Sequence, residues 1–172
     1  EIVGWAASAT VTDVDDAVAA AERAFPEWRD RGVRDRAQLL HRAAVIIRER
    51  RTDLAAWIVH EAGKPWREAD GDVIEAIDFL EYYGREAIDL QTPRRLGELP
   101  GEINLYLREP RGVVGVIAPW NFPLAILTGM TAAALATGNT VVMKPARPTP
   151  VIAAHLVAIL EEAGLPPGVV NY

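Results

Sequence analysis

Two polar side chains follow strand-like runs inside a stretch of the sequence that is otherwise uncharged. Between Arg111 and Lys144 there is no ionisable side chain. Asn121 lies in a proline-flanked loop after the first apolar run, and Lys144 ends the second run. An amide that donates a hydrogen bond to developing negative charge suits an oxyanion hole, where losing one donor costs roughly 3–4 kcal/mol. A lysine ammonium at a strand end can donate to ribose hydroxyls or to phosphate.

Both residues, and the two aromatic side chains beside Asn121, also have structural interpretations. Asn121 could bond its own backbone, as asparagines in turns do. Lys144 could reach solvent from the end of its strand. Trp120 and Phe122 fit anchors of a hydrophobic core better than platforms on which a ligand stacks. The local pattern therefore leaves a functional and a structural role open.

The elements around these residues have the pattern of a β-α-β unit. Apolar runs over 113–118 and 140–143 predict strands, and a helix-like run that ends at Gly138 lies between them. Continuous apolar runs are typical of parallel strands that are buried on both faces. Since such crossovers are right-handed, both strands end at the same edge of the sheet, where open α/β sheets bind ligands. We therefore expect Asn121 and Lys144 to project into one crevice.

Four amphipathic helices are predicted before this unit. The first is expected to have its N-cap at Thr12 or Asp13 and to end at Pro26. The fourth covers 66–88, and on it Glu75 and Asp78 lie one turn apart, most simply on a solvated face. The fold class is therefore α/β, with N-terminal helices followed by β-α-β-α units of a parallel sheet.

The segment between the helices and the β-α-β unit predicts an exposed strand. A connection rich in Pro, Gly and Arg covers 91–101, and apolar and polar residues then alternate over 103–108. An alternating strand with an unpaired edge can pair with another subunit. We therefore interpret 100–112 as a strand and turn used for oligomerisation.

Composition and charge exclude several classes of function. A net charge of −6 argues against a nucleic-acid surface, which requires a basic patch. The sequence has no cysteine, so it contains no disulfide, thiolate metal site or cysteine nucleophile, and its three histidines lack ligand spacing. We therefore predict no metal. Neither G-x-G-x-x-G nor a Walker sequence is present.

The uncharged stretch is long enough for a membrane span to be considered. Pro119, Asn121, Pro123, Gly138 and Asn139 divide it into pieces too short to cross a bilayer. The first residues are neither basic nor a long apolar run, so they do not resemble a signal peptide. No membrane span and a cytoplasmic location are predicted.

Several ordered motifs resemble those of the aldehyde dehydrogenase superfamily along the whole chain. They include Ala118-Pro119-Trp120-Asn121-Phe122-Pro123, Ala136-Thr137-Gly138-Asn139-Thr140 and Lys144-Pro145-Ala146. Within the superfamily, the residues over 64–70 and 75–83 most resemble the 1-pyrroline-5-carboxylate (L-glutamate γ-semialdehyde) dehydrogenases of proline breakdown. The resemblance implies NAD(P)-dependent oxidation of an aldehyde substrate through a thiohemiacetal and a thioester, a Rossmann-like sheet and a homo-oligomer.

The resemblance also assigns roles to individual residues. Asn121 matches the catalytic asparagine that polarises the aldehyde carbonyl. The cofactor would be held by the backbone of Ile117, Ala118, Pro119 and Trp120 on the nicotinamide side and by Lys144 at the adenine ribose. Glu75 and Phe122 match positions that contact the substrate, with Glu75 facing its amino group.

Two departures from the family pattern matter. The nucleophilic cysteine, the general-base glutamate and the glycine motif under the pyrophosphate lie, in the family, beyond residue 172. We therefore interpret 1–172 as the N-terminal part of the NAD(P)-binding domain, unable to catalyse the reaction alone. In addition, Arg147 stands where the family often has an acid that binds the adenine ribose, and a guanidinium can pair with a 2′-phosphate. Tolerance of NADP beside NAD is predicted.

Two alternatives remain open at this point. One is an aldehyde dehydrogenase that acts on a different aldehyde or semialdehyde. The other is a structural or interaction protein that keeps the nucleotide fold but is not catalytic. The presence or absence of the cysteine downstream would distinguish the second alternative from an enzyme.

Overall fold

The structure is a computed structural model that describes residues 2–172. Its N-terminal half consists of the helices α1 (Val11–Asp30), α2 (Val33–Glu49), α3 (Arg51–Ala62) and α4 (Trp66–Leu90). A two-stranded hairpin follows, formed by β1 (Arg94–Arg95) and β2 (Leu105–Tyr106). The C-terminal half alternates strands and helices: β3 (Val113–Ile117), α5 (Ala125–Ala136), β4 (Thr140–Lys144), α6 (Pro150–Glu162) and β5 (Val170–Asn171).

The strands β3, β4 and β5 form a parallel sheet in sequence order, which confirms the predicted α/β fold class. β3 pairs with β4 along its whole length, from Val113 opposite Thr140 to Ile117 opposite Lys144. β5 pairs with β4 at Val141 and Val142. Because the strands are parallel and in register, β3 and β4 end side by side.

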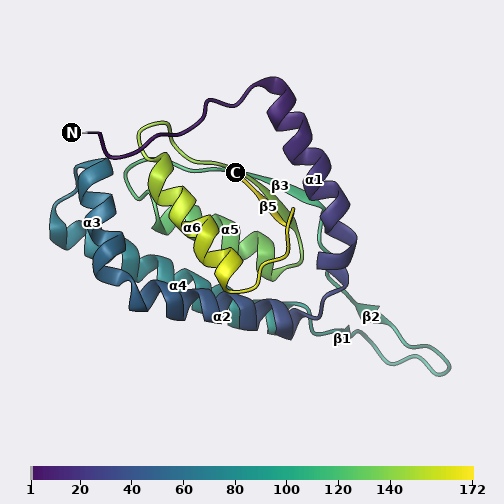
Figure 1. The fold of residues 1–172 in the computed structure, drawn as a ribbon. Helices are drawn as coiled ribbons and strands as arrows, with labels where there is room; N and C mark the ends of the chain where they lie inside the picture. The colour runs from purple at the N-terminus through teal and green to yellow at the C-terminus, as the bar shows by residue number, and fades with distance from the viewer. Residues whose placement is uncertain (1) are drawn as a thin grey trace.

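Helices cover the sheet in layers (Figure 1). α1 contacts all three strands of the parallel sheet. α5 packs against β3 and β4, and α5 and α6 in turn contact the outer helices α2, α3 and α4. The buried core runs through these layers and is formed mainly by Ala, Val, Leu and Ile side chains.

Two predictions for the first helix were wrong. Its N-cap is Thr10, whose hydroxyl accepts a hydrogen bond from the Asp13 N–H while the Asp13 carboxylate accepts one from the Thr10 N–H. This capping box places Asp13 inside the first turn. The helix also continues through Pro26 to Asp30. Beyond the proline, Trp28 is only 1% exposed, and burying this side chain offsets the lost backbone hydrogen bond.

The hairpin projects away from the layered body (Figure 1). Arg94 pairs with Tyr106 and Arg95 with Leu105 in an antiparallel ladder. The predicted strand over 103–108 is therefore shorter than expected, and part of the predicted connection over 91–101 is its partner. We call residues 94–106 the arm.

A buried arginine joins the ends of three helices near the base of the arm. Arg36 donates hydrogen bonds to the carbonyls of Arg29 (3.2 Å), Arg31 and Ala136 (3.1 Å), and to the Gln91 side chain (2.5 Å). These carbonyls lie at the C-terminal ends of α1 and α5, where backbone acceptors lack partners within the helix. Burial, with a contribution from the Arg31 charge, lowers the pKa of Arg36.

Candidate functional site

The two predicted polar residues lie at the same edge of the parallel sheet. Ile117 at the end of β3 is paired with Lys144 at the end of β4. The Ala118 N–H donates to the Lys144 carbonyl at 3.2 Å, which extends the ladder by one residue. Asn121 follows three residues later, in the loop that leads to α5. The side chains of Asn121 and Lys144 are both exposed at this edge.

The residues predicted for the nicotinamide side differ in exposure. Ala118 is buried, whereas Pro119 and Trp120 are exposed and Ile117 is 73% exposed. Since all four are predicted to act through their backbone, their side chains need not enter the site. The exposed apolar side chains do show that this edge of the sheet is uncovered in the chain described.

A buried carboxylate holds the end of the loop that carries Asn121. Asp72 on α4 is 0% exposed, and its Oδ1 accepts a hydrogen bond from the Ala125 N–H at 2.7 Å. Ala125 is the first residue of α5, and the cap residue Leu124 offers no side-chain hydrogen bond. A negative charge satisfies the free N–H groups and the dipole at a helix N-terminus. Asp72 therefore caps α5 in place of a local side chain, although it lies 53 positions away from Ala125 in the sequence.

Lys64 connects this carboxylate to the middle of the same loop. Its Nζ lies 2.9 Å from Asp72 Oδ2 and donates to the Asn121 carbonyl at 3.0 Å. The ammonium also lies 4.0 Å from the centroid of the Phe122 ring, a cation–π distance. One lysine thus contacts two predicted site residues and the acid that caps α5.

The other residues predicted from the resemblance lie around this group. Phe122 is half-buried beneath Lys64, so it lies neither in the core nor free in solvent. Glu75 is half-buried on α4, three residues after Asp72, and Asp78 is exposed. The prediction that these two acids lie on a solvated helix face therefore fits Asp78 better than Glu75.

A second acid caps the helix that follows β4. Glu61 accepts hydrogen bonds from the N–H groups of Val151 (2.6 Å) and Ile152 (2.9 Å), in the first turn of α6. The connection that carries Arg147, an exposed residue, thus runs from the end of β4 to a fixed helix start. The Tyr172 hydroxyl donates to the Pro150 carbonyl at 2.6 Å, and burial, with the Glu61 charge, raises the pKa of Tyr172.

Sequence reasoning missed Lys64, Asp72 and Glu61 as parts of this arrangement. For Asp72 a signal was present, because this acid lies between Ala69, Val73 and Ala76 on the buried face of α4. An acid on an apolar face requires a partner. No local pattern identifies that partner, since it is a backbone N–H on another helix.

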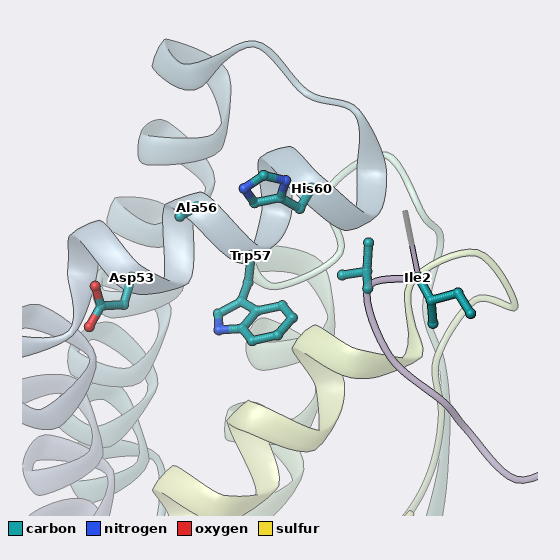
Figure 2. A pocket seen from close by; sticks show the side chains of 6 residues that line it. Ile2, Asp53, Ala56, Trp57 and His60 are labelled. Atoms are coloured by element: carbon teal, nitrogen blue, oxygen red, sulfur yellow. The ribbon is translucent and has the colours of Figure 1, made fainter.

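A cavity of about 690 Å³ lies elsewhere, between the N-terminal segment and α3. Its lining includes Ile2, Asp53, Trp57 and His60 (Figure 2), and none of the predicted site residues. The Trp57 ring lies 4.9 Å from that of His155 on α6.

Across residues 2–172, no group of three or more His, Asp or Glu side chains could hold a metal ion. In the same range, no helix is both long and apolar enough to cross a membrane.

The fold and the site together define a class. A parallel sheet, an amide-bearing loop after one strand and a lysine at the end of the next make an α/β protein, and open α/β sheets as a class bind ligands at this edge. The chain belongs to the aldehyde dehydrogenase family, whose model matches residues 1–172. This match confirms the predicted resemblance.

Relatives of the narrower predicted group match over the whole chain. 1-Pyrroline-5-carboxylate dehydrogenase 1 of Halalkalibacterium halodurans is 51% identical over 172 residues, which are all of this chain and 33% of that protein. 1-Pyrroline-5-carboxylate dehydrogenase 2 of Bacillus subtilis is also 51% identical, with the same coverage. The chain therefore spans about a third of the length of the curated relatives it matches.

Solved structures agree with this similarity. A 1-pyrroline-5-carboxylate dehydrogenase from Thermus with bound NAD matches with a TM-score of 0.94 and 47% identity, over 96% of this chain and 32% of that one. Proline utilization A from Bdellovibrio bacteriovorus, inactivated by N-propargylglycine, matches with a TM-score of 0.93 and 50% identity. That match covers 95% of this chain and 17% of the other.

Proposed function

We propose that this chain is the N-terminal part of an NAD-dependent aldehyde dehydrogenase that oxidises L-glutamate γ-semialdehyde to glutamate. The observation that carries the proposal is the register of β3 and β4, which puts the Asn121 loop and Lys144 at one edge of the sheet. The identity of the substrate is inferred from the relatives named 1-pyrroline-5-carboxylate dehydrogenase, which are about half identical to this chain over its whole length.

In this proposal Asn121 is the catalytic residue of the chain. Its side-chain amide donates to the aldehyde oxygen, and the hydrogen bond strengthens as that oxygen becomes an oxyanion in the tetrahedral intermediate. The exposed amide in a loop held at both ends fits this role, because a preorganised donor needs no rearrangement during the reaction. The chain has no cysteine, so in this proposal the nucleophile belongs to the rest of the enzyme. The family resemblance puts the general-base glutamate there as well.

The edge of the sheet also fits a dinucleotide, which accepts a hydride when bound. Lys144 presents an exposed ammonium that can donate to the hydroxyls of the adenine ribose. The backbone of Ile117, Ala118, Pro119 and Trp120 lines the nicotinamide side. Arg147, three residues after Lys144, could pair with a 2′-phosphate, so we propose that the enzyme tolerates NADP beside NAD.

Two residues are proposed to hold the amino-acid end of the substrate. Glu75 supplies a carboxylate for the substrate amino group. Phe122 supplies an apolar surface, and Lys64 contacts the face of its ring.

We further propose a cytoplasmic homo-oligomer in which the arm, with the adjoining residues up to 112, pairs with another subunit.

The function is tested by assaying the full-length protein that contains this chain on glutamate γ-semialdehyde, succinate semialdehyde and a simple aliphatic aldehyde. We expect NAD-dependent oxidation with the highest kcat/KM for glutamate γ-semialdehyde. Asn121→Ala should lower kcat by about 100–1,000-fold with little effect on NAD affinity. A higher kcat/KM for another aldehyde would refute the substrate assignment, and inactivity on all three would refute the enzyme.

A further inference from the structure

The loop between β3 and α5 is held at three points by groups from outside it. At its start, the Ala118 N–H bonds to the Lys144 carbonyl at 3.2 Å. At its end, the Ala125 N–H bonds to Asp72 at 2.7 Å. In its middle, the Asn121 carbonyl accepts from Lys64 Nζ at 3.0 Å. The middle contact involves the same residue whose side chain is proposed to bind the oxyanion.

Lys64 is itself fixed in place by Asp72. Its side chain is only 12% exposed, and its ammonium lies 2.9 Å from a carboxylate that is fully buried. A buried carboxylate is stable only when its charge and lone pairs are satisfied, and here Lys64 and the Ala125 N–H satisfy them. The two residues therefore form one unit that joins α4, the turn before it and the N-terminus of α5.

We propose that Lys64 and Asp72 are positioning residues for the oxyanion donor, a role that rests on the proposed function of Asn121. Lys64 holds the main chain of residue 121 and, through its contact with the Phe122 ring, the neighbouring residue that would touch the substrate. The side-chain amide extends from a main chain that is fixed by this contact. A misplacement of about 1 Å in such a group can cost about 100-fold in rate.

The neighbouring ion pair Arg51–Asp70 provides a matched control. Arg51 Nε and Nη2 donate to the two oxygens of Asp70 at 2.5 and 2.6 Å, and the pair also joins the α3 region to α4. Its hydrogen bonds do not involve the loop. Arg51→Met thus removes a basic residue and its ion pair from the same region without touching the proposed positioning unit.

The test compares Lys64→Met, Lys64→Arg and Arg51→Met in the full-length enzyme, each with and without Asn121→Ala. We expect Lys64→Met to lower kcat by about 10–100-fold, with the KM for NAD within about twofold, and Lys64→Arg to recover most of the loss. Arg51→Met should leave kcat unchanged. If Lys64 acts through Asn121, Lys64→Met should have little further effect in the Asn121→Ala background.

Three results would overturn the proposal. The first is an equal loss of kcat for Lys64→Met with and without Asn121→Ala, and the second is an unchanged kcat in Lys64→Met. Hydrogen exchange of peptides covering 118–126 provides a readout independent of activity and remains informative if the parent protein proves inactive. We expect faster exchange in Lys64→Met and Asp72→Asn but not in Arg51→Met. The third result that would overturn the proposal is unchanged exchange in both Lys64→Met and Asp72→Asn.

Discussion

Acids from the N-terminal helices cap the two helices that follow the strands of the site. Asp72 on α4 caps α5, and Glu61 at the end of α3 caps α6. Each acid thereby fixes the far end of a loop that begins at the carboxyl edge of the sheet. At the scale of single residues, the geometry of the candidate site depends on side chains that the proposed chemistry does not use.

Arg147 gives the residue-scale prediction about nucleotide choice. We expect Arg147→Glu to lower the ratio of kcat/KM with NADP to kcat/KM with NAD by at least about tenfold, because a carboxylate repels a 2′-phosphate. The exposed Arg67 on α4 provides a control with the same change of charge, and Arg67→Glu should leave the ratio unchanged. A strong NAD preference in the parent that Arg147→Glu does not alter would contradict the proposal.

The sequence was sufficient to predict the edge shared by Asn121 and Lys144. Both follow apolar runs that are joined through a helix, and such a crossover connects parallel strands, so local pattern and topology were enough. Lys64 could not be predicted in the same way. It meets Asn121 across 57 positions, and nothing in the local pattern of either residue indicates such a contact.

At the scale of elements, α4 and α5 approach each other closely at a glycine. A Cβ built on Gly129 of α5 would lie 2.9 Å from Cδ2 of Phe79 on α4. The Phe79 ring would have to shift to admit this Cβ, and it stacks on Tyr83 with 5.8 Å between the ring centroids. Gly84 on α4 differs, since a Cβ there would meet Ala37 of α2 at 3.5 Å or more, an ordinary contact.

The same substitution is predicted to have different effects at these two glycines. Gly129→Ala should destabilise the protein by about 1–3 kcal/mol through overpacking between α4 and α5. Gly84→Ala should be neutral or stabilise it by up to about 1 kcal/mol, because alanine favours the helix. Thermal unfolding of the full-length protein measures both. A midpoint for Gly129→Ala at or above that of the parent would contradict the close packing.

Helix boundaries show where a local rule was insufficient. Pro26 was expected to end the first helix, but the last turn of α1 continues to Asp30 and buries Trp28 against the core. A proline removes one backbone hydrogen bond and strains the turn before it, at a cost of about 3 kcal/mol. Whether packing offsets this cost depends on the tertiary structure, which the local sequence does not contain.

At the scale of the whole molecule, the arm is the part that lies outside the layered body (Figure 1). Its exposed large apolar residues are Leu96, Leu99, Ile103, Leu105 and Tyr106. Apolar side chains on an exposed two-stranded hairpin, which is marginally stable alone, are consistent with a partner strand or surface. The exposed strand was predictable from its alternating pattern, whereas its pairing with Arg94 and Arg95 was not.

The oligomerisation proposal predicts that charges on the arm reduce assembly. Leu99→Asp with Ile103→Asp should lower the molecular mass in solution, because buried charges disfavour an interface. Light scattering coupled to size-exclusion chromatography measures the mass. Tyr82→Asp on the exposed face of α4 controls for the loss of a surface apolar residue and should not change it. An unchanged mass in the arm variant would exclude this role.

The most direct test of the shared site is a crystal structure of the full-length protein with NAD bound. We expect an adenine ribose hydroxyl within about 2.7–3.2 Å of Lys144 Nζ. We also expect the nicotinamide beside the backbone of residues 117–120, with the Asn121 amide facing the space next to it. A dinucleotide bound away from the ends of β3 and β4, with Lys144 and Asn121 both left in solvent, would contradict the proposed site.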